Sequence, residues 1–169
     1  MASTKLGRFI RRGLMVLLGA LLVIQFFRPA PNNSMDDTKL ITKSFETSGP
    51  VLEILKTSCF DCHSNNTVYP WYSKVQPIAW WLDDHVKEGK REINFSEFSG
   101  YSPRRQFKKF KEIVEQVETD EMPLSSYTLV HQNAKLSDSQ KLALMDWAKA
   151  CQEKMKLEYP IDSLQKKKG

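Results

Sequence analysis

The sequence lacks several patterns that would assign it to common fold classes. It contains no alternating apolar–polar stretch of useful length, no internal repeat and no low-complexity tract, so we expect helices rather than a β-sheet. No βαβ pattern surrounds its cysteines, which argues against a thioredoxin-like redox site. It also lacks a second pair of metal ligands at regular spacing, because Cys151 is alone and His85 and His131 are scattered. A structural zinc site is therefore a weak alternative.

Acidic residues are absent from the N-terminal segment. Residues 1–28 contain five basic and no acidic residues, whereas the remaining 141 residues contain 20 of each sign. The net charge of +5 therefore comes from one end of the chain, and the rest is neutral overall. A neutral domain gives no case for nucleic-acid binding.

The same segment has the layout of a membrane signal. A basic start over residues 5–12 precedes an apolar run over residues 13–27, which is typical of a signal peptide or a signal anchor. No small-x-small cleavage site comes after it, so we favour an uncleaved transmembrane anchor. With Phe9 and Ile10 included, it reaches about 19 residues and about 28 Å, just enough to span a bilayer. A cleaved signal peptide is the alternative, and in both cases the rest of the chain is exported.

The basic flank predicts the orientation of the chain. Positive residues stay on the cytoplasmic side, which places the chain after Pro29 on the periplasmic side of a bacterial cytoplasmic membrane. We therefore expect a single-pass membrane protein whose folded part lies outside the cytoplasm.

Five consecutive residues carry the main chemical signal. The run Cys59-Phe60-Asp61-Cys62-His63 is C-x-x-C-H, the attachment signature of a c-type haem. In such a site the two thiols form thioethers with one porphyrin, and the histidine binds the iron as the proximal axial ligand. A disulfide between Cys59 and Cys62 remains open for an exported protein. Because c-type haem is attached outside the bacterial cytoplasmic membrane, the motif and the export signal agree.

The motif and the export signal together suggest a division of the chain into four segments. These are a signal anchor at residues 1–29, a tether at 30–38, a haem-binding domain at 39–157 and a polar basic tail at 158–169.

Apolar periodicity and capping signals predict an all-α fold of four or five short helices with long loops. The helices are expected over about residues 38–47, from Gly49 into Cys59, from Pro77 to Gly89, from Ser102 to about Val117, and from Ser137 to about Met155. In the third, the expected inner face is made by Ile78, Trp81, Leu82, His85 and Val86. In the last, a capping box at Ser137–Gln140 precedes a buried stripe of Leu144, Ala148, Cys151 and Met155.

Basic residues cluster in the helix that begins at Ser102. They are Arg104, Arg105, Lys108, Lys109 and Lys111. We interpret them as the solvated side of an amphipathic helix, with steering of an acidic redox partner as the alternative.

Residues 50–150 resemble a bacterial haem-binding domain family, known for a single C-x-x-C-H in an exported, mostly helical domain. The resemblance is carried by Cys59 to Asn65, Thr67 to Tyr72, Pro77 to Trp81, His85, Glu88-Gly89, Asn94-Phe95-Ser96, Glu121-Met122-Pro123, Tyr127, His131 and Trp147. It implies one covalent haem held by Cys59, Cys62 and His63. The layout is also similar to class I cytochromes c, with an early haem motif, a late Met-Pro loop and a closing helix.

Three residues are candidates for a second axial ligand opposite His63. Met122 is the first choice, because it lies in a Met-Pro step about 60 residues after the motif, where similar cytochromes place a distal methionine. A thioether ligand raises the reduction potential relative to a second histidine. His85 is the second candidate and His131 the third, although both histidines suit a role in orienting a propionate or a ligand.

These observations lead to three functional hypotheses. The first is a membrane-tethered monohaem cytochrome that exchanges electrons with unidentified redox partner proteins at the membrane. The second is a haem-based sensor or small-ligand-binding protein with an open sixth site. The third is an enzyme such as a peroxidase, which ranks lowest because no acid-base constellation is evident beside a distal site.

Overall fold

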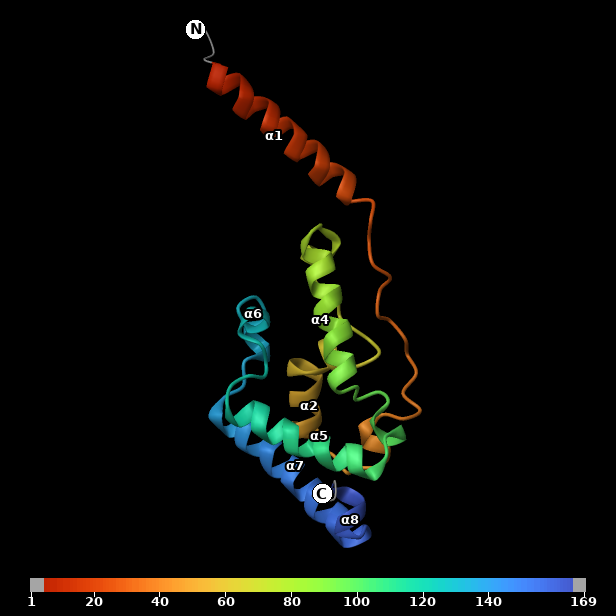
Figure 1. The fold of residues 1–169 in the computed structure, drawn as a ribbon. Coiled ribbons are helices and arrows are strands. Elements are labelled where there is room, and N and C mark those ends of the chain that lie inside the picture. Colours follow the sequence, from red (N-terminus) through yellow and green to blue (C-terminus); the bar gives the residue numbers. More distant parts are fainter. Residues whose placement is uncertain (1–4, 166–169) are drawn as a thin grey trace. The chain divides into compact units, whose positions relative to one another are not determined.

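A computed structural model describes residues 5–165, and within them the fold is all-α (Figure 1). These residues contain no strand, and their only β-type pairing is one antiparallel bridge between Asn33 and Asn66. The predicted all-α class is therefore confirmed. Residues 1–4 of the predicted anchor and residues 166–169 of the predicted tail lie outside the described part of the chain.

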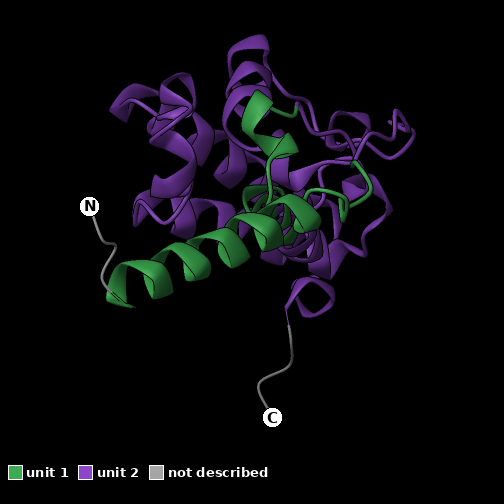
Figure 2. Ribbon diagram, turned by 90° about the horizontal axis from the view of Figure 1, so that it is seen from above, with its two compact units in different colours: residues 1–31, 69–85 green, residues 32–68, 86–169 purple. Residues whose placement is uncertain are grey.

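The chain divides into two compact units (Figure 2). Unit 1 consists of residues 1–31 and 69–85, and unit 2 consists of residues 32–68 and 86–169. Helix α4, Ile78–Glu92, contributes its first half to unit 1 and its second half to unit 2. The domain boundaries drawn from the sequence stay predictions.

Unit 1 contains the N-terminal helix and an aromatic segment. Helix α1 spans Lys5–Ile24 and buries none of its residues, and η2 spans Trp71–Lys74. Within the described range, no helix combines the length and apolarity required to cross a bilayer. The predicted transmembrane segment is therefore helical, but its membrane crossing is not supported.

Unit 2 contains the remaining elements. They are η1 (Ile41–Lys43), α2 (Gly49–Ser58), α3 (Phe60–His63), η3 (Phe98–Gly100), α5 (Pro103–Glu118), α6 (Ser125–Thr128), η4 (Gln132–Ala134), α7 (Asp138–Glu158) and α8 (Ile161–Leu164). Helix α5 packs along α7, while α2 contacts α7 and α8 contacts α5 (Figure 1). The helix expected over residues 38–47 is reduced to η1, and the loop expected after Met122 contains α6 and η4.

An aromatic cluster forms the centre of unit 2. Phe45, Phe98 and Phe110 pack with centroid separations of 4.7–5.8 Å, and Trp147 lies 5.5 Å from Phe110. Edge-to-face contacts of this kind add to the free energy gained by burying the rings. The indole Nε1–H of Trp147 donates to the carbonyl of Glu46 at 3.0 Å, so the last long helix is fixed to the segment before α2.

Helix α7 begins and packs as the sequence predicts. The Ser137 hydroxyl accepts a hydrogen bond from the backbone N–H of Gln140. The side-chain oxygen of Gln140 accepts one from the backbone N–H of Ser137, which completes the capping box. The predicted stripe is confirmed, because its four residues are the ones that α7 buries.

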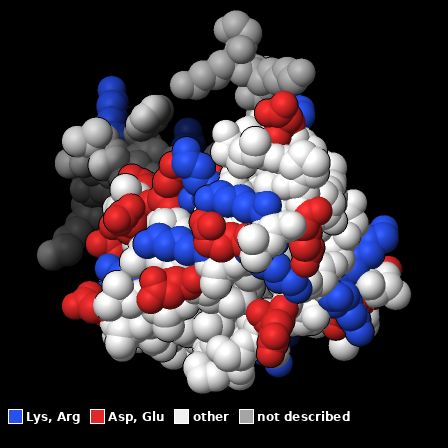
Figure 3. All heavy atoms as spheres, turned by 90° about the horizontal axis from the view of Figure 1, so that it is seen from below, with Lys and Arg blue, Asp and Glu red and all other residues white. Residues whose placement is uncertain are grey.

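The basic side chains of α5 have acidic neighbours. Lys108 Nζ lies 3.0 Å from Glu112, and Lys109 Nζ lies 2.6 Å from Glu112 and 3.3 Å from Glu92. Interpreting Lys109 as solvated is wrong, because it is buried. On the face shown in Figure 3, basic and acidic residues are interspersed. These pairs reduce the positive charge that α5 offers to a partner.

Two leucines near the start of α7 test this packing. Leu144 is fully buried and Leu142 is 56% exposed. We expect Leu144→Ala to lower the free energy of unfolding by about 2–5 kcal/mol, because it removes methyl groups and leaves a cavity. Leu142→Ala should change it by less than about 0.5 kcal/mol. Chemical denaturation followed by circular dichroism measures both, and equal effects would contradict the packing described.

Candidate haem-attachment site

The C-x-x-C-H motif lies at a junction between two helices. Cys59 ends α2, where its N–H donates to the carbonyl of Leu55 at 3.0 Å. The next residues form the single turn α3, in which the N–H groups of Cys62 and His63 both donate to the carbonyl of Cys59. The predicted helix from Gly49 into Cys59 is therefore confirmed, with Cys59 as its C-terminal cap, while Cys62 belongs to the following turn.

The side chain of His63 is oriented by Gly89 in the second half of α4 and by Ile93, which directly follows that helix. Its Nδ1 lies 2.8 Å from the carbonyl oxygen of Gly89 and 3.1 Å from that of Ile93. Carbonyls only accept hydrogen bonds, so Nδ1 carries the proton and Nε2 carries the lone pair. Burial lowers the pKa of His63 below its usual value, against the opposing effect of these two hydrogen bonds. At neutral pH the ring is therefore neutral, and its lone pair is on Nε2, the atom that could bind a metal.

Gly89 permits α4 to approach the motif. A Cβ atom at this position would lie 2.7 Å from the carbonyl oxygen of Cys62 and 3.2 Å from its Cβ. The sequence prediction that Gly89 ends the helix is wrong, because α4 continues to Glu92 and Gly89 is buried. The glycine is required by close packing rather than by helix termination.

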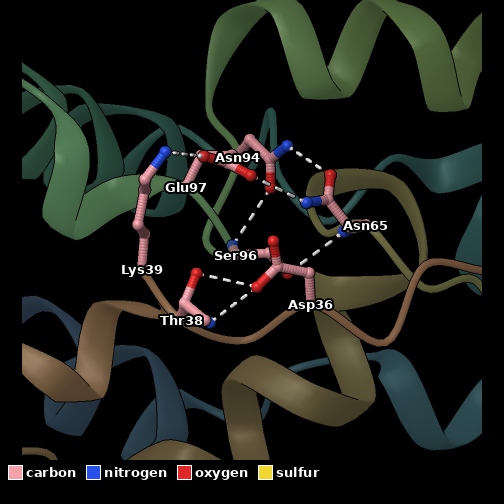
Figure 4. Close-up of polar contacts among 7 residues, drawn as sticks. All are labelled: Asp36, Thr38, Lys39, Asn65, Asn94, Ser96 and Glu97. Carbon is pink, nitrogen blue, oxygen red and sulfur yellow. Dashed lines mark hydrogen bonds and ion pairs between the residues drawn. The ribbon is translucent and has the colours of Figure 1, made fainter.

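The segment after the motif is fixed by a polar network (Figure 4). The side chain of Asn94 donates to that of Asn65 at 2.8 Å, and the Ser96 hydroxyl accepts the N–H of Asn65 at 3.1 Å. Asn65 also donates to Glu97 at 3.1 Å. Because the N–H of Phe95 donates to the carbonyl of His63 at 2.7 Å, the network continues directly into the motif.

Asp61, the second residue between the cysteines, joins the motif to α6. One carboxylate oxygen accepts the N–H of Val68 at 3.0 Å, and the other accepts the hydroxyl of Tyr127 at 2.7 Å. The carbonyl of Asp61 accepts the hydroxyl of Thr67 at 2.6 Å. A hydrogen bond to an ionised carboxylate is stronger than a neutral one, so Tyr127 fixes the loop around α6 against the motif.

That loop contains two of the three predicted distal ligands. Met122 and His131 lie on either side of Tyr127 in the sequence, and all three side chains are half-buried. The rings of Tyr127 and His131 stack with centroids 4.3 Å apart and an interplanar angle of 12°. The structure therefore brings the Met122 and His131 segment to the motif, although ligation by either residue stays a prediction.

The turn before Met122 is also fixed. Asp120 adopts a left-handed backbone conformation with a φ of 60°, which aspartate tolerates better than most residues. Its carboxylate pairs with Lys141 at the start of α7. The N–H of Met122 donates to the carbonyl of Gln116 at 3.0 Å, so the chain turns sharply after α5.

His85, the other predicted distal ligand, belongs to unit 1. Its Nδ1 donates to the carbonyl of Trp81 at 2.8 Å, and its ring centroid lies 4.2 Å from that of Trp81. The predicted inner face of α4 is confirmed in part: Leu82 and Val86 are buried, whereas Ile78 and Trp81 are exposed and Ala79 is buried instead. Ligation by His85 stays a prediction from the sequence.

The donor set suits a haem attached through sulfur. The described cysteines are free thiols, and no group of three or more His, Cys, Asp or Glu side chains within residues 5–165 is arranged to hold a metal ion. Burial raises the pKa of Cys59 to about 12 and that of Cys62 to about 11, so both are protonated thiols at neutral pH. Two thiols beside a neutral imidazole whose lone pair is on Nε2 fit a c-type haem better than zinc, which requires more ligands.

A family model for a haem-binding domain matches residues 19–150, which is more than half of the chain. The chain belongs to the haem-binding domain family. This match confirms two predictions from the sequence, namely the family membership and the binding of haem. No curated protein and no solved structure matches this chain.

Sequence reasoning missed the part that three residues play in the site, since it gave Gly89 only the role of a helix end and gave Asp61 and Tyr127 none. Gly89, Asp61 and Tyr127 contact the motif or form part of it, and each carries part of the family resemblance. Their spacing along the chain gave no signal of these contacts, because the contacts join segments that are distant in sequence.

A glycine comparison tests the approach of α4. Gly89→Ala should lower the free energy of unfolding by about 1–3 kcal/mol, because its methyl group overlaps the backbone of Cys62. Gly49→Ala is the matched control, since a Cβ there meets nothing within 4 Å. Urea denaturation measures both variants. An unaffected Gly89→Ala protein would show that α4 does not contact the motif as described.

A tyrosine comparison tests the link between α6 and the motif. Tyr127→Phe removes the hydroxyl that binds Asp61 and should cost about 1–2 kcal/mol of unfolding free energy. Hydrogen exchange at residues 122–131 should increase in the same variant, because this loop loses its attachment. Tyr159→Phe, at a residue 37% exposed, serves as the control. Unchanged exchange in both variants would rule out this role for Tyr127.

Proposed function

We propose that this protein is a membrane-tethered monohaem cytochrome of the c type that carries one electron between partner proteins. The observation that carries the proposal is the state of His63. Its Nδ1–H is engaged by two backbone carbonyls, which leaves the lone pair on Nε2, and His63 directly follows the second of two free thiols in the sequence. Bound haem supplies one-electron chemistry, and the protein sets its potential and access.

The residues of this chain have separate tasks in the proposal. Cys59 and Cys62 hold the porphyrin through thioethers, and His63 binds the iron on the proximal side. The two hydrogen bonds to Nδ1 fix the ring plane and raise the basicity of Nε2. Phe95, which is buried and lies 6.3 Å from the His63 ring, keeps water from the proximal side.

The distal side is assigned to the loop around α6. The link from Tyr127 to Asp61 supports Met122 as the sixth ligand, since both residues belong to the one short segment held against the motif. A thioether at this position stabilises the ferrous state relative to a second histidine. A displaceable sixth ligand would instead favour the sensor function, and absorption spectra distinguish the two.

Covalent attachment is tested by mass. The full chain should be produced in a bacterial host that matures c-type cytochromes, denatured, and measured by intact-mass spectrometry. We expect the mass of one haem to remain after denaturation, and to be lost in the Cys59→Ala, Cys62→Ala double variant. Cys151→Ala is the control that keeps it, because Cys151 is a buried residue of α7. A wild-type mass without haem from a competent host would refute the proposal.

The distal ligand is tested by absorption spectra of both oxidation states. Wild-type ferric protein should show the weak far-red band of a thioether-ligated haem, and Met122→Ala should abolish it. His131→Ala and His85→Ala should leave the band in place. A five-coordinate wild-type spectrum that changes on adding carbon monoxide would support the sensor instead, because it requires an open sixth site.

A further inference from the structure

Unit 1 presents a group of exposed aromatic and aliphatic side chains beside the end of α1. These are Phe26, Phe27, Trp71, Ile78, Trp80 and Trp81, here called the Trp surface, with exposed fractions from 41% to 86%. Three of the four tryptophans of the chain belong to it. Isolated exposed apolar residues are normal, whereas several large ones on one compact unit indicate an interaction site.

The Trp surface is built onto the end of α1 by specific hydrogen bonds. The carbonyl of Phe27 accepts the indole N–H of Trp80 at 2.7 Å and the side-chain amide of Gln76 at 2.8 Å. Gln76, which is 2% exposed, also exchanges two hydrogen bonds with the side chain of Gln25. Residues 69–85 are therefore held to the segment that continues the apolar run of α1 (Figure 2).

These contacts also bear on whether the N-terminal segment is retained. Removal of residues up to Phe27 would take the Phe27 carbonyl from the side-chain N–H of Gln76 and the Gln25 side chain from its backbone N–H and carbonyl. The family match begins at residue 19, within α1. Both observations favour a mature protein that keeps α1 and its junction with Trp80.

We infer that the Trp surface lies in the headgroup region of a phospholipid bilayer, next to the end of α1. Three features select lipid as the occupant. Tryptophan rings accumulate at the membrane–water boundary, where the ring is apolar and the N–H is satisfied. The surface continues the apolar exposed side chains of α1. The basic residues Lys5, Arg8, Arg11 and Arg12 at the other end of that helix suit anionic headgroups.

This inference deepens the tether in the proposed function and rests on that part of it. It adds a second attachment point, formed by residues far along the chain from α1. The inference does not require α1 to cross the bilayer. A helix lying in the membrane interface would also place the contact between Phe27 and Trp80 at the level of the headgroups.

Photocrosslinking to lipid tests the Trp surface. The full-length holoprotein is reconstituted in phospholipid vesicles that contain a lipid with a diazirine near the headgroup, irradiated, and mapped by peptide mass spectrometry. We expect adducts on residues 71–81 as well as on α1. The peptide that carries Leu157, which is 89% exposed in unit 2, is the internal control and should carry few adducts.

Substitutions make the test specific. A Trp71→Ser, Trp81→Ser double variant should lower the adduct yield on residues 71–81 by about tenfold, because two aromatic rings lose their gain from leaving water. Leu157→Ser should leave that yield unchanged. Adducts confined to α1 would overturn the inference, and so would crosslinks between copies of the chain in place of lipid adducts.

The same samples separate this inference from the proposed function. The intact mass of the reconstituted protein reports the covalent haem independently of lipid contact. Lipid adducts on a protein without haem would refute only the cytochrome, whereas haem without adducts on residues 71–81 would refute only the Trp surface.

Discussion

The site depends on the hydrogen bonds between the His63 ring and the backbone at the end of α4 and directly after it. A neutral imidazole binds a metal through the nitrogen that carries no proton. The carbonyls of Gly89 and Ile93 select that tautomer and fix the ring plane at the same time. They can do so because α4 lies against the turn of Cys62 without an intervening side chain. The chemistry of the ligand thus follows from the packing of two backbones.

Local signals in the sequence predicted the elements that local forces determine. The capping box at Ser137 and the stripe from Leu144 to Met155 specify α7 almost completely, because helix initiation and amphipathic periodicity involve residues one to seven positions apart. The C-x-x-C-H motif likewise contains its own chemistry within five residues. For this reason the sequence alone is enough to predict Cys59, Cys62 and His63 as the haem-binding residues.

Contacts between distant segments explain what the sequence did not reveal. The buried side of α4 runs through Ala79, Leu82 and Val86. It differs from the face inferred by periodicity, in which Ile78 and Trp81 were expected to be buried. Gly89 resembles a helix terminator in isolation, and only the neighbouring Cys62 shows why a side chain is excluded. Residues 38–47 carry helical propensity, yet the backbone N–H of Ile41 donates to Phe95, which favours a tertiary contact over a longer helix.

The two positions between the cysteines have more than a spacing role. Phe60 packs against Phe95 with a centroid separation of 5.4 Å, and Asp61 binds Tyr127. Grafting the corresponding dipeptide of a c-type cytochrome into this chain would preserve the sulfur spacing while detaching two neighbouring segments. The two intervening residues of the motif therefore also hold Phe95 and the loop around α6 against it.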